Sequence, residues 1–121
     1  MGQPQLRGIA GMPRRAFVSV HAGAGNYSPK REGEITKLCT QACEMAMRTL
    51  HDGQSSIVAA SEAVKFMEDH DATNAGFGSN LNQDGFVECD ASIMEGISGL
   101  QAYVGAVPSI ATCAQVIMSQ P

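Results

Sequence analysis

Two glycine-rich segments carry the residues whose types and spacing are best suited to chemistry. The first, His-Ala-Gly-Ala-Gly at 21–25, ends a short apolar run, and the second, Asn-Ala-Gly-Phe-Gly-Ser-Asn, spans 74–80. Glycine lets backbone N–H and C=O groups approach a ligand closely, so such segments can line a site or bind an ion. For each segment an ordinary turn or surface loop is the alternative.

Common site motifs are absent. A dinucleotide-binding loop needs a third glycine where Ser28 stands, and the acidic residues of 71–84 lack EF-hand spacing. Glu88 and Asp90 fall on one face of a predicted strand, where solvation explains them better than a glycosidase pair does. The three histidines have no partner spacing.

Cys39 and Cys43 are four residues apart on a predicted helix and therefore share a face. A zinc site would need two further ligands at a recognisable spacing, and none is present. We expect buried free thiols in a reducing compartment, which favours the cytoplasm, the nucleus or both.

Hydrophobic periodicity and turn residues predict the elements that must position these segments. In chain order they are a buried strand at 16–21, a helix at 33–51, a helix capped by Ser55 or Ser56, a loop at 69–84, strands at 86–94 and 101–107, and a helix at 109–118. The second helix should bury Ile57, Ala60, Ala63, Val64 and Met67. The two long helices should pair antiparallel, giving an α+β fold.

Composition sets the broad class. Apolar residues make up 44% of the 121 residues, enough for a core, and no apolar run is long enough to span a membrane. Residues 1–15 hold three arginines and no acid, which predicts a flexible basic tail. From Glu32 onward there are three basic and twelve acidic residues, so we expect no nucleic-acid partner. Three strands make a poor isolated domain, which indicates part of a larger unit.

The two glycine-rich segments, together with Glu-Cys-Asp-Ala-Ser-Ile-Met at 88–94, resemble the plant-type asparaginase family of N-terminal-nucleophile hydrolases. The resemblance runs from about residue 17 to 107 and falls in the N-terminal part of the family. The asparaginases usually carry glycine where this chain has Ala22 and valine where it has Asn80. These departures resemble the threonine aspartase branch of the family.

The resemblance implies an αββα sandwich, of which residues 16–121 would be an incomplete N-terminal part of the α subunit. Family precursors cut themselves into α and β subunits, expose a nucleophilic threonine on β, and pair as dimers of αβ units. A threonine aspartase-like protein would cleave protein substrates after aspartate, including nuclear transcription regulators. The alternatives are an isoaspartyl peptidase or L-asparaginase-type amidohydrolase, and a non-catalytic truncated isoform that binds a full-length subunit.

The resemblance also implies site residues. Gly23 would present its backbone amide near the substrate, and Asn74 would lie beside the nucleophile. A sodium ion, with no other cofactor, would bind the backbone carbonyls of Met67, Glu68, His70, Thr73, Ala75 and Phe77. No threonine of this chain lies in the family's Gly-Thr-Val-Gly context, so there is no catalytic residue here. We therefore expect no hydrolytic activity from this chain alone.

Overall fold

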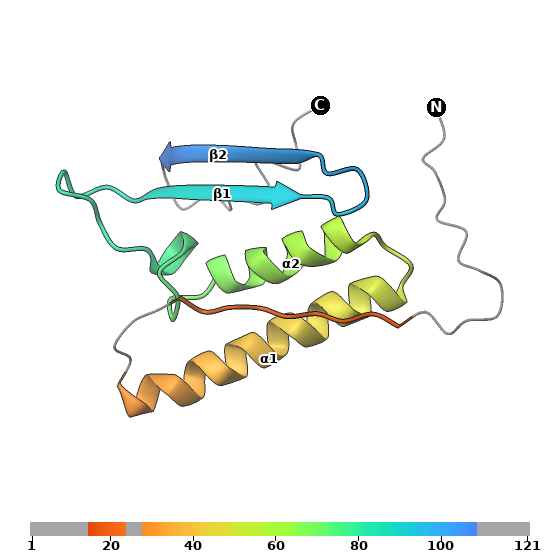
Figure 1. Ribbon diagram of the computed structural model, residues 1–121. Coiled ribbons are helices and arrows are strands. Elements are labelled where there is room, and N and C mark those ends of the chain that lie inside the picture. Colours follow the sequence, from red (N-terminus) through yellow and green to blue (C-terminus); the bar gives the residue numbers. More distant parts are fainter. Residues whose placement is uncertain (1–14, 24–27, 109–121) are drawn as a thin grey trace.

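The described residues form two helices and a small antiparallel sheet, which confirms the α+β prediction (Figure 1). The computed structural model describes residues 15–23 and 28–108. Its elements are α1 (Pro29–His51), α2 (Ser56–Glu68), the 3-10 turn η1 (Gly76–Gly78), β1 (Glu88–Met94) and β2 (Gln101–Pro108). The predicted helix at 109–118 and nearly all of the predicted tail at 1–15 lie outside the described residues.

Helix α1 begins four residues before the predicted start at residue 33. Pro29 occupies its first turn, where the missing N–H costs no hydrogen bond, and the carbonyl of Ser28 accepts from the amides of Arg31 and Glu32. Apolar periodicity missed this turn because its side chains are polar and exposed. The predicted stop is confirmed, since Gly53 follows the helix with φ of 84°.

Helix α2 begins where the capping prediction placed it, because the Ser55 hydroxyl accepts a hydrogen bond from the amide of Val58 at 3.3 Å. Its predicted inner face was partly wrong. Ala63 and Met67 are buried as expected, whereas Ala60 and Val64 are exposed. The first turns of α2 are apolar on several sides, so periodicity could not select the face that meets α1.

The two helices pack against each other as an antiparallel pair (Figure 1). Most buried core side chains are alanines, which let two helix backbones approach closely. The buried apolar residues are Leu38, Ala42, Ala46, Ala59, Ala63, Met67 and Ala72. No helix within the described ranges combines the length and apolarity that crossing a membrane requires.

The predicted buried strand at 16–21 was wrong. These residues are extended, but they lie on the helix pair rather than in a sheet. Val18, Val20 and Ala22 pack against the helical core, whereas Phe17 is 89% exposed. Both helices and residues 17–21 line a cavity of about 400 Å³. The alternation that resembled a strand is therefore satisfied by packing on helices.

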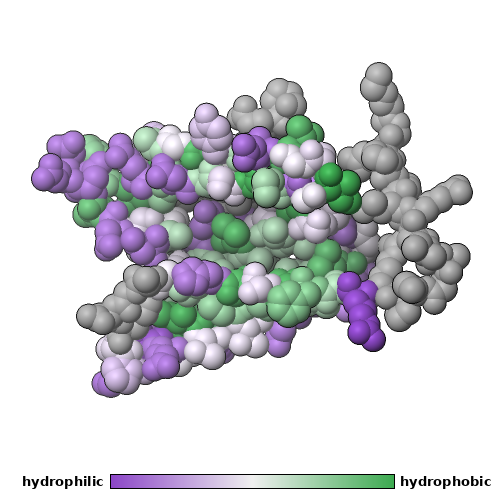
Figure 2. Space-filling model, in the orientation of Figure 1, coloured by the Kyte–Doolittle hydropathy of each residue, from purple (hydrophilic) through white to green (hydrophobic). Residues whose placement is uncertain are grey.

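The predicted strands at 86–94 and 101–107 are confirmed as an antiparallel hairpin, on the α2 side of the helix pair (Figure 1). The described residues contain two strands rather than the expected three. Cys89 of β1 is half-buried. Apolar surface is visible along the helix layer and near the hairpin tip, and polar surface gathers at the opposite end (Figure 2).

A bulge interrupts the hairpin near the start of β1. Cys89 pairs with Val107 and Ala91 with Val104, so two residues of β2 oppose the single residue Asp90. The second of them, Ala106, has φ of 52°, and its amide donates to Asp90 Oδ1 at 2.8 Å. The carboxylate thus replaces the ladder hydrogen bond that the bulge removes.

Replacing Leu38 with alanine tests the helix interface. Leu38 is the largest side chain that is almost fully buried, at 2% exposure. We expect a loss of about 2–5 kcal/mol in the free energy of unfolding, measured by urea denaturation. Leu81→Ala is the matched control, since Leu81 is 65% exposed and should change stability by less than about 0.5 kcal/mol. Equal losses in the two variants would contradict this packing.

Candidate functional site

The loop that follows α2 folds back onto the end of that helix. Thr73 is buried, and its hydroxyl donates to the carbonyl oxygen of Met67 at 2.9 Å. Ala72 is buried beside it in the helical core. At the helix end Lys65 pairs with Asp69, and this hydrogen bond raises the pKa of Lys65. The loop is therefore held at a defined position against α2.

Two glycines of the loop are required by steric contact. A Cβ on Gly76 would lie 2.4 Å from the carbonyl oxygen of Glu68, and a Cβ on Gly78 would lie 2.1 Å from that of Thr73. Gly76 also has φ of 55°, which favours glycine. Close backbone approach, expected from the sequence, is thus observed, but the neighbour is the protein's own backbone.

Asn74, the predicted active-site residue, is exposed and closes the loop. Its side-chain Oδ1 accepts a hydrogen bond from the amide of Asn80 at 2.8 Å. One residue earlier, the Ser79 hydroxyl lies 3.2 Å from the sulfur of Cys89, which joins the loop to β1. The Asn74 side chain therefore has a structural partner, and its exposure leaves it accessible.

Gly23, the other predicted lining residue, ends the extended segment. It is exposed, and a Cβ built on it would meet no atom within 4 Å. The segment ends at the same end of the helix pair as the loop (Figure 1). The Asn74 side chain accepts its hydrogen bond from the backbone amide of Asn80 and not from that of Gly23. No hydrogen bond therefore joins the two predicted residues through this side chain.

The carbonyls predicted to bind sodium belong to the last turn of α2 and to this folded loop. Those of Met67 and Ala75 accept internal hydrogen bonds, from the Thr73 hydroxyl and the amide of Gly78. Those of Glu68 and Thr73 lie directly against the two loop glycines. Backbone oxygens are suitable ligands for a hard cation, and each carbonyl has two lone pairs. The donor set therefore fits such an ion.

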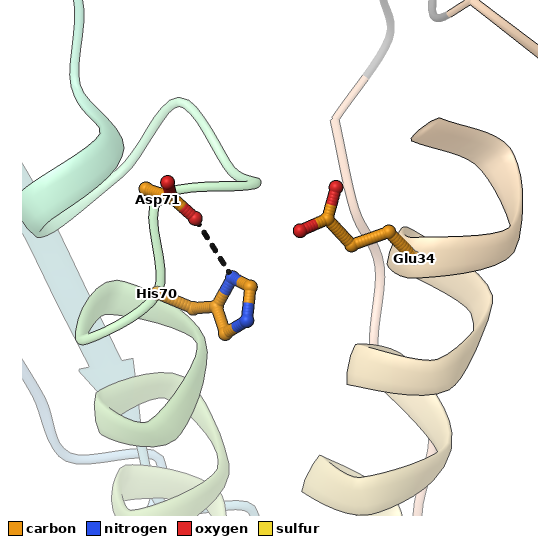
Figure 3. A group of neighbouring side chains, drawn as sticks. All are labelled: Glu34, His70 and Asp71. Atoms are coloured by element: carbon orange, nitrogen blue, oxygen red, sulfur yellow. Dashed lines mark ion pairs between the residues drawn. The ribbon is translucent and has the colours of Figure 1, made fainter. Parts of the chain in front are cut away.

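One group of side chains was missed from the sequence. Glu34, His70 and Asp71 offer ligand atoms that all lie within 4.8 Å of one another (Figure 3). Glu34 comes from α1, whereas the other two follow α2, so no sequence spacing could bring them together. The adjacent His-Asp pair was the one available signal, and it is weak alone.

Comparison with known proteins gives consistent matches. The family model described as Asparaginase matches residues 14–119. The isoaspartyl peptidase/L-asparaginase of Rattus norvegicus is 40% identical over 95 residues, covering 78% of this chain and 28% of the relative. The corresponding Homo sapiens protein is 40% identical over 96 residues, covering 78% and 31%. The plant-type L-asparaginase of Thermococcus kodakarensis is 43% identical over 84 residues, covering 67% and 26%. The chain thus spans roughly three tenths of the length of these relatives.

Gly78→Ala tests whether the loop conformation depends on close backbone approach. Because the new methyl group would overlap the Thr73 carbonyl oxygen, we expect a loss of about 1–3 kcal/mol in the free energy of unfolding, measured by urea denaturation. Gly33→Ala is the control, since its Cβ would meet nothing within 4 Å and alanine favours the helix. A Gly78→Ala protein as stable as the wild type would refute the packing described for this loop.

Proposed function

Because the chain belongs to the asparaginase family, we propose that it forms part of an amidohydrolase of the isoaspartyl peptidase/L-asparaginase type. The observation that carries this proposal is about 40% identity to proteins of that name. Such an enzyme hydrolyses the side-chain amide of asparagine, releasing ammonia, or the isoaspartyl peptide bond, releasing the next amino acid. The chain spans about three tenths of these relatives, so the activity is proposed for the assembled enzyme.

The proposed enzyme would be an αββα sandwich assembled from this chain and a β subunit of the same precursor, and its αβ units would pair as dimers. Helices α1 and α2 would supply part of one helical layer, and the hairpin part of a sheet. The exposed apolar side chains of Met94 and Tyr103, at 65% and 82% exposure, support this proposal, because further layers would cover them.

Within that enzyme we assign Gly23 a backbone amide facing the substrate and Asn74 a place beside the nucleophile. Both are exposed. The nucleophilic threonine would come from the β subunit. The environment of the threonines here supports this assignment, because the hydroxyls of Thr40, Thr49 and Thr73 each donate to a backbone carbonyl.

We also propose that the loop after α2 binds sodium through the carbonyls of Met67, Glu68, His70, Thr73, Ala75 and Phe77. When bound, the ion would supply positive charge that balances the negative ends of the carbonyl dipoles. The chain's own part is to hold those oxygens in place, through the Thr73 hydroxyl and the two close glycine contacts.

A threonine aspartase-type endopeptidase, which cleaves proteins after aspartate, is the second candidate. Ala22 and Asn80 favour it, because they replace the glycine and valine usual in asparaginases. The backbone amide of Asn80 also donates to Asn74 Oδ1, so this departure lies next to the proposed site. The curated matches favour the amidohydrolase.

Substrate preference separates the two candidates. The parent precursor, once processed, should hydrolyse a β-aspartyl dipeptide and L-asparagine, measured by release of the free amino acid and of ammonia. It should leave a peptide with an internal Asp–Gly bond intact. Cleavage of that peptide alone would instead assign the endopeptidase. The present chain alone should show no turnover on any of them, and turnover that persists through repeated purification would contradict the proposed role of the β subunit.

Variants of Asn74 in the same precursor test its position. Asn74→Asp keeps an oxygen acceptor for the Asn80 amide but changes the charge beside the nucleophile. We expect at least about a tenfold loss in kcat/KM at unchanged unfolding midpoint. A purely structural Asn74 would instead leave Asn74→Asp active and only Asn74→Ala impaired.

A further inference from the structure

We propose that Glu34, His70 and Asp71 form a binding site for a divalent transition-metal ion of the zinc class. The ligands of this site are side chains, so the site is distinct from the backbone carbonyls proposed above to bind sodium. It does not depend on the proposed function, because it rests on the arrangement of these three residues alone.

The three side chains converge from two separate elements. Glu34 projects from the second turn of α1, and its carboxylate points toward His70 across the gap between the helices (Figure 3). His70 and Asp71 directly follow the end of α2. The candidate ligand atoms all lie within 4.8 Å of one another. Side-chain rotations that move these atoms by roughly 1 Å would place each of them about 2.0–2.2 Å from a shared metal ion.

Each of the three side chains can offer a lone pair to a metal ion. The backbone amide of Ala72 donates to His70 Nδ1 at 3.2 Å, so this nitrogen carries its lone pair, and a metal ion would take the place of the amide there. Asp71 Oδ1, which is also an acceptor, lies 3.4 Å from the same nitrogen. These two atoms are therefore close enough to bind one ion.

The protein supplies no lysine or arginine for this purpose in the part of the chain that the structure describes. Lys65, on the last turn of α2, is paired with Asp69. Within residues 15–23 and 28–108 the ion pairs include no lysine or arginine bound to Glu34 or Asp71. A cation bound to these side chains would therefore come from solution.

Ligand chemistry indicates which ion would bind. Imidazole nitrogen is a good ligand for Zn²⁺ and Co²⁺ and a poor one for Mg²⁺ or Ca²⁺, which prefer oxygen alone. One nitrogen and two carboxylates give three ligands, leaving a fourth position for water. The side chains of His70 and Asp71 are 40% and 67% exposed, so an ion can enter directly from solvent.

Occupation would join the start of α1 to the loop that carries Asn74. An ion that binds only the folded chain raises its stability as the ion concentration exceeds the dissociation constant. The expected signature is thus both saturable binding and a rise in the unfolding temperature.

The test uses the full chain, titrated with Zn²⁺ by isothermal calorimetry and repeated with Co²⁺ by visible absorption. We expect one Zn²⁺ per chain and no displacement by excess Mg²⁺. His70→Gln and Glu34→Gln should each weaken binding at least about tenfold. The matched controls His51→Gln and Glu44→Gln, which change the same residue types elsewhere on α1, should bind as the wild type does.

Glu34→Gln keeps the proposal testable if His70→Gln perturbs the loop, because it changes a ligand on another element. Co²⁺ bound at this site should lack the strong near-ultraviolet band of a cobalt–thiolate complex. Absence of saturable binding would overturn the proposal. Binding that is unchanged in both ligand variants would place the ion at another site. A thiolate band would place it at the cysteines. Either result would also overturn the proposal.

Discussion

The close contact between α1 and α2 determines the positions of the N-terminal extended segment and of the loop that follows α2. Alanines at most interface positions bring the two helices together, and Leu38 and Met67 fill the remaining space. The N-terminal extended segment packs on this pair, and the glycine-rich loop starts from the end of α2. The proximity of Glu34 to His70 depends on the same contact. A larger residue on the alanine face would therefore change both candidate ion sites together.

The glycine-rich loop has a structural role that sequence chemistry alone did not predict. Its glycines contact the chain's own carbonyls, so they are constrained by packing whether or not a ligand is present. The groups that this packing leaves at the surface include the Asn74 side chain. Conformational order in such a loop reduces the entropy lost when a substrate or ion binds. An ordered loop of this kind is better suited to supporting an active site than to adapting its shape to different ligands.

Local signals predicted local structure well. Gly53 marks the end of α1, Ser55 caps α2, and the two alternating runs form the hairpin. The errors arose where tertiary packing decides the outcome. The alternation around Val18 and Val20 fits a strand and also fits packing on helices, and nothing local distinguishes them.

The site was predictable only in part. The glycine-rich loop shows the close backbone approach that its composition indicated, although the neighbours of Gly76 and Gly78 are the chain's own carbonyls. The roles of Gly23 and Asn74 stay predictions. The Glu34 and His70 pair lies 36 positions apart, and only the folded helix pair brings the two side chains together.

The bulge at Asp90 has a consequence for the specificity of strand pairing. A hairpin with regular alternation can shift by a residue pair without losing its face pattern. Here Ala106, in a left-handed conformation, must lie opposite Asp90 for its amide to donate to the carboxylate. Any other alignment leaves that amide without its acceptor and places the irregular residue against a regular one. The bulge therefore fixes a single alignment and makes this part of β2 a poor template for the strand of another molecule.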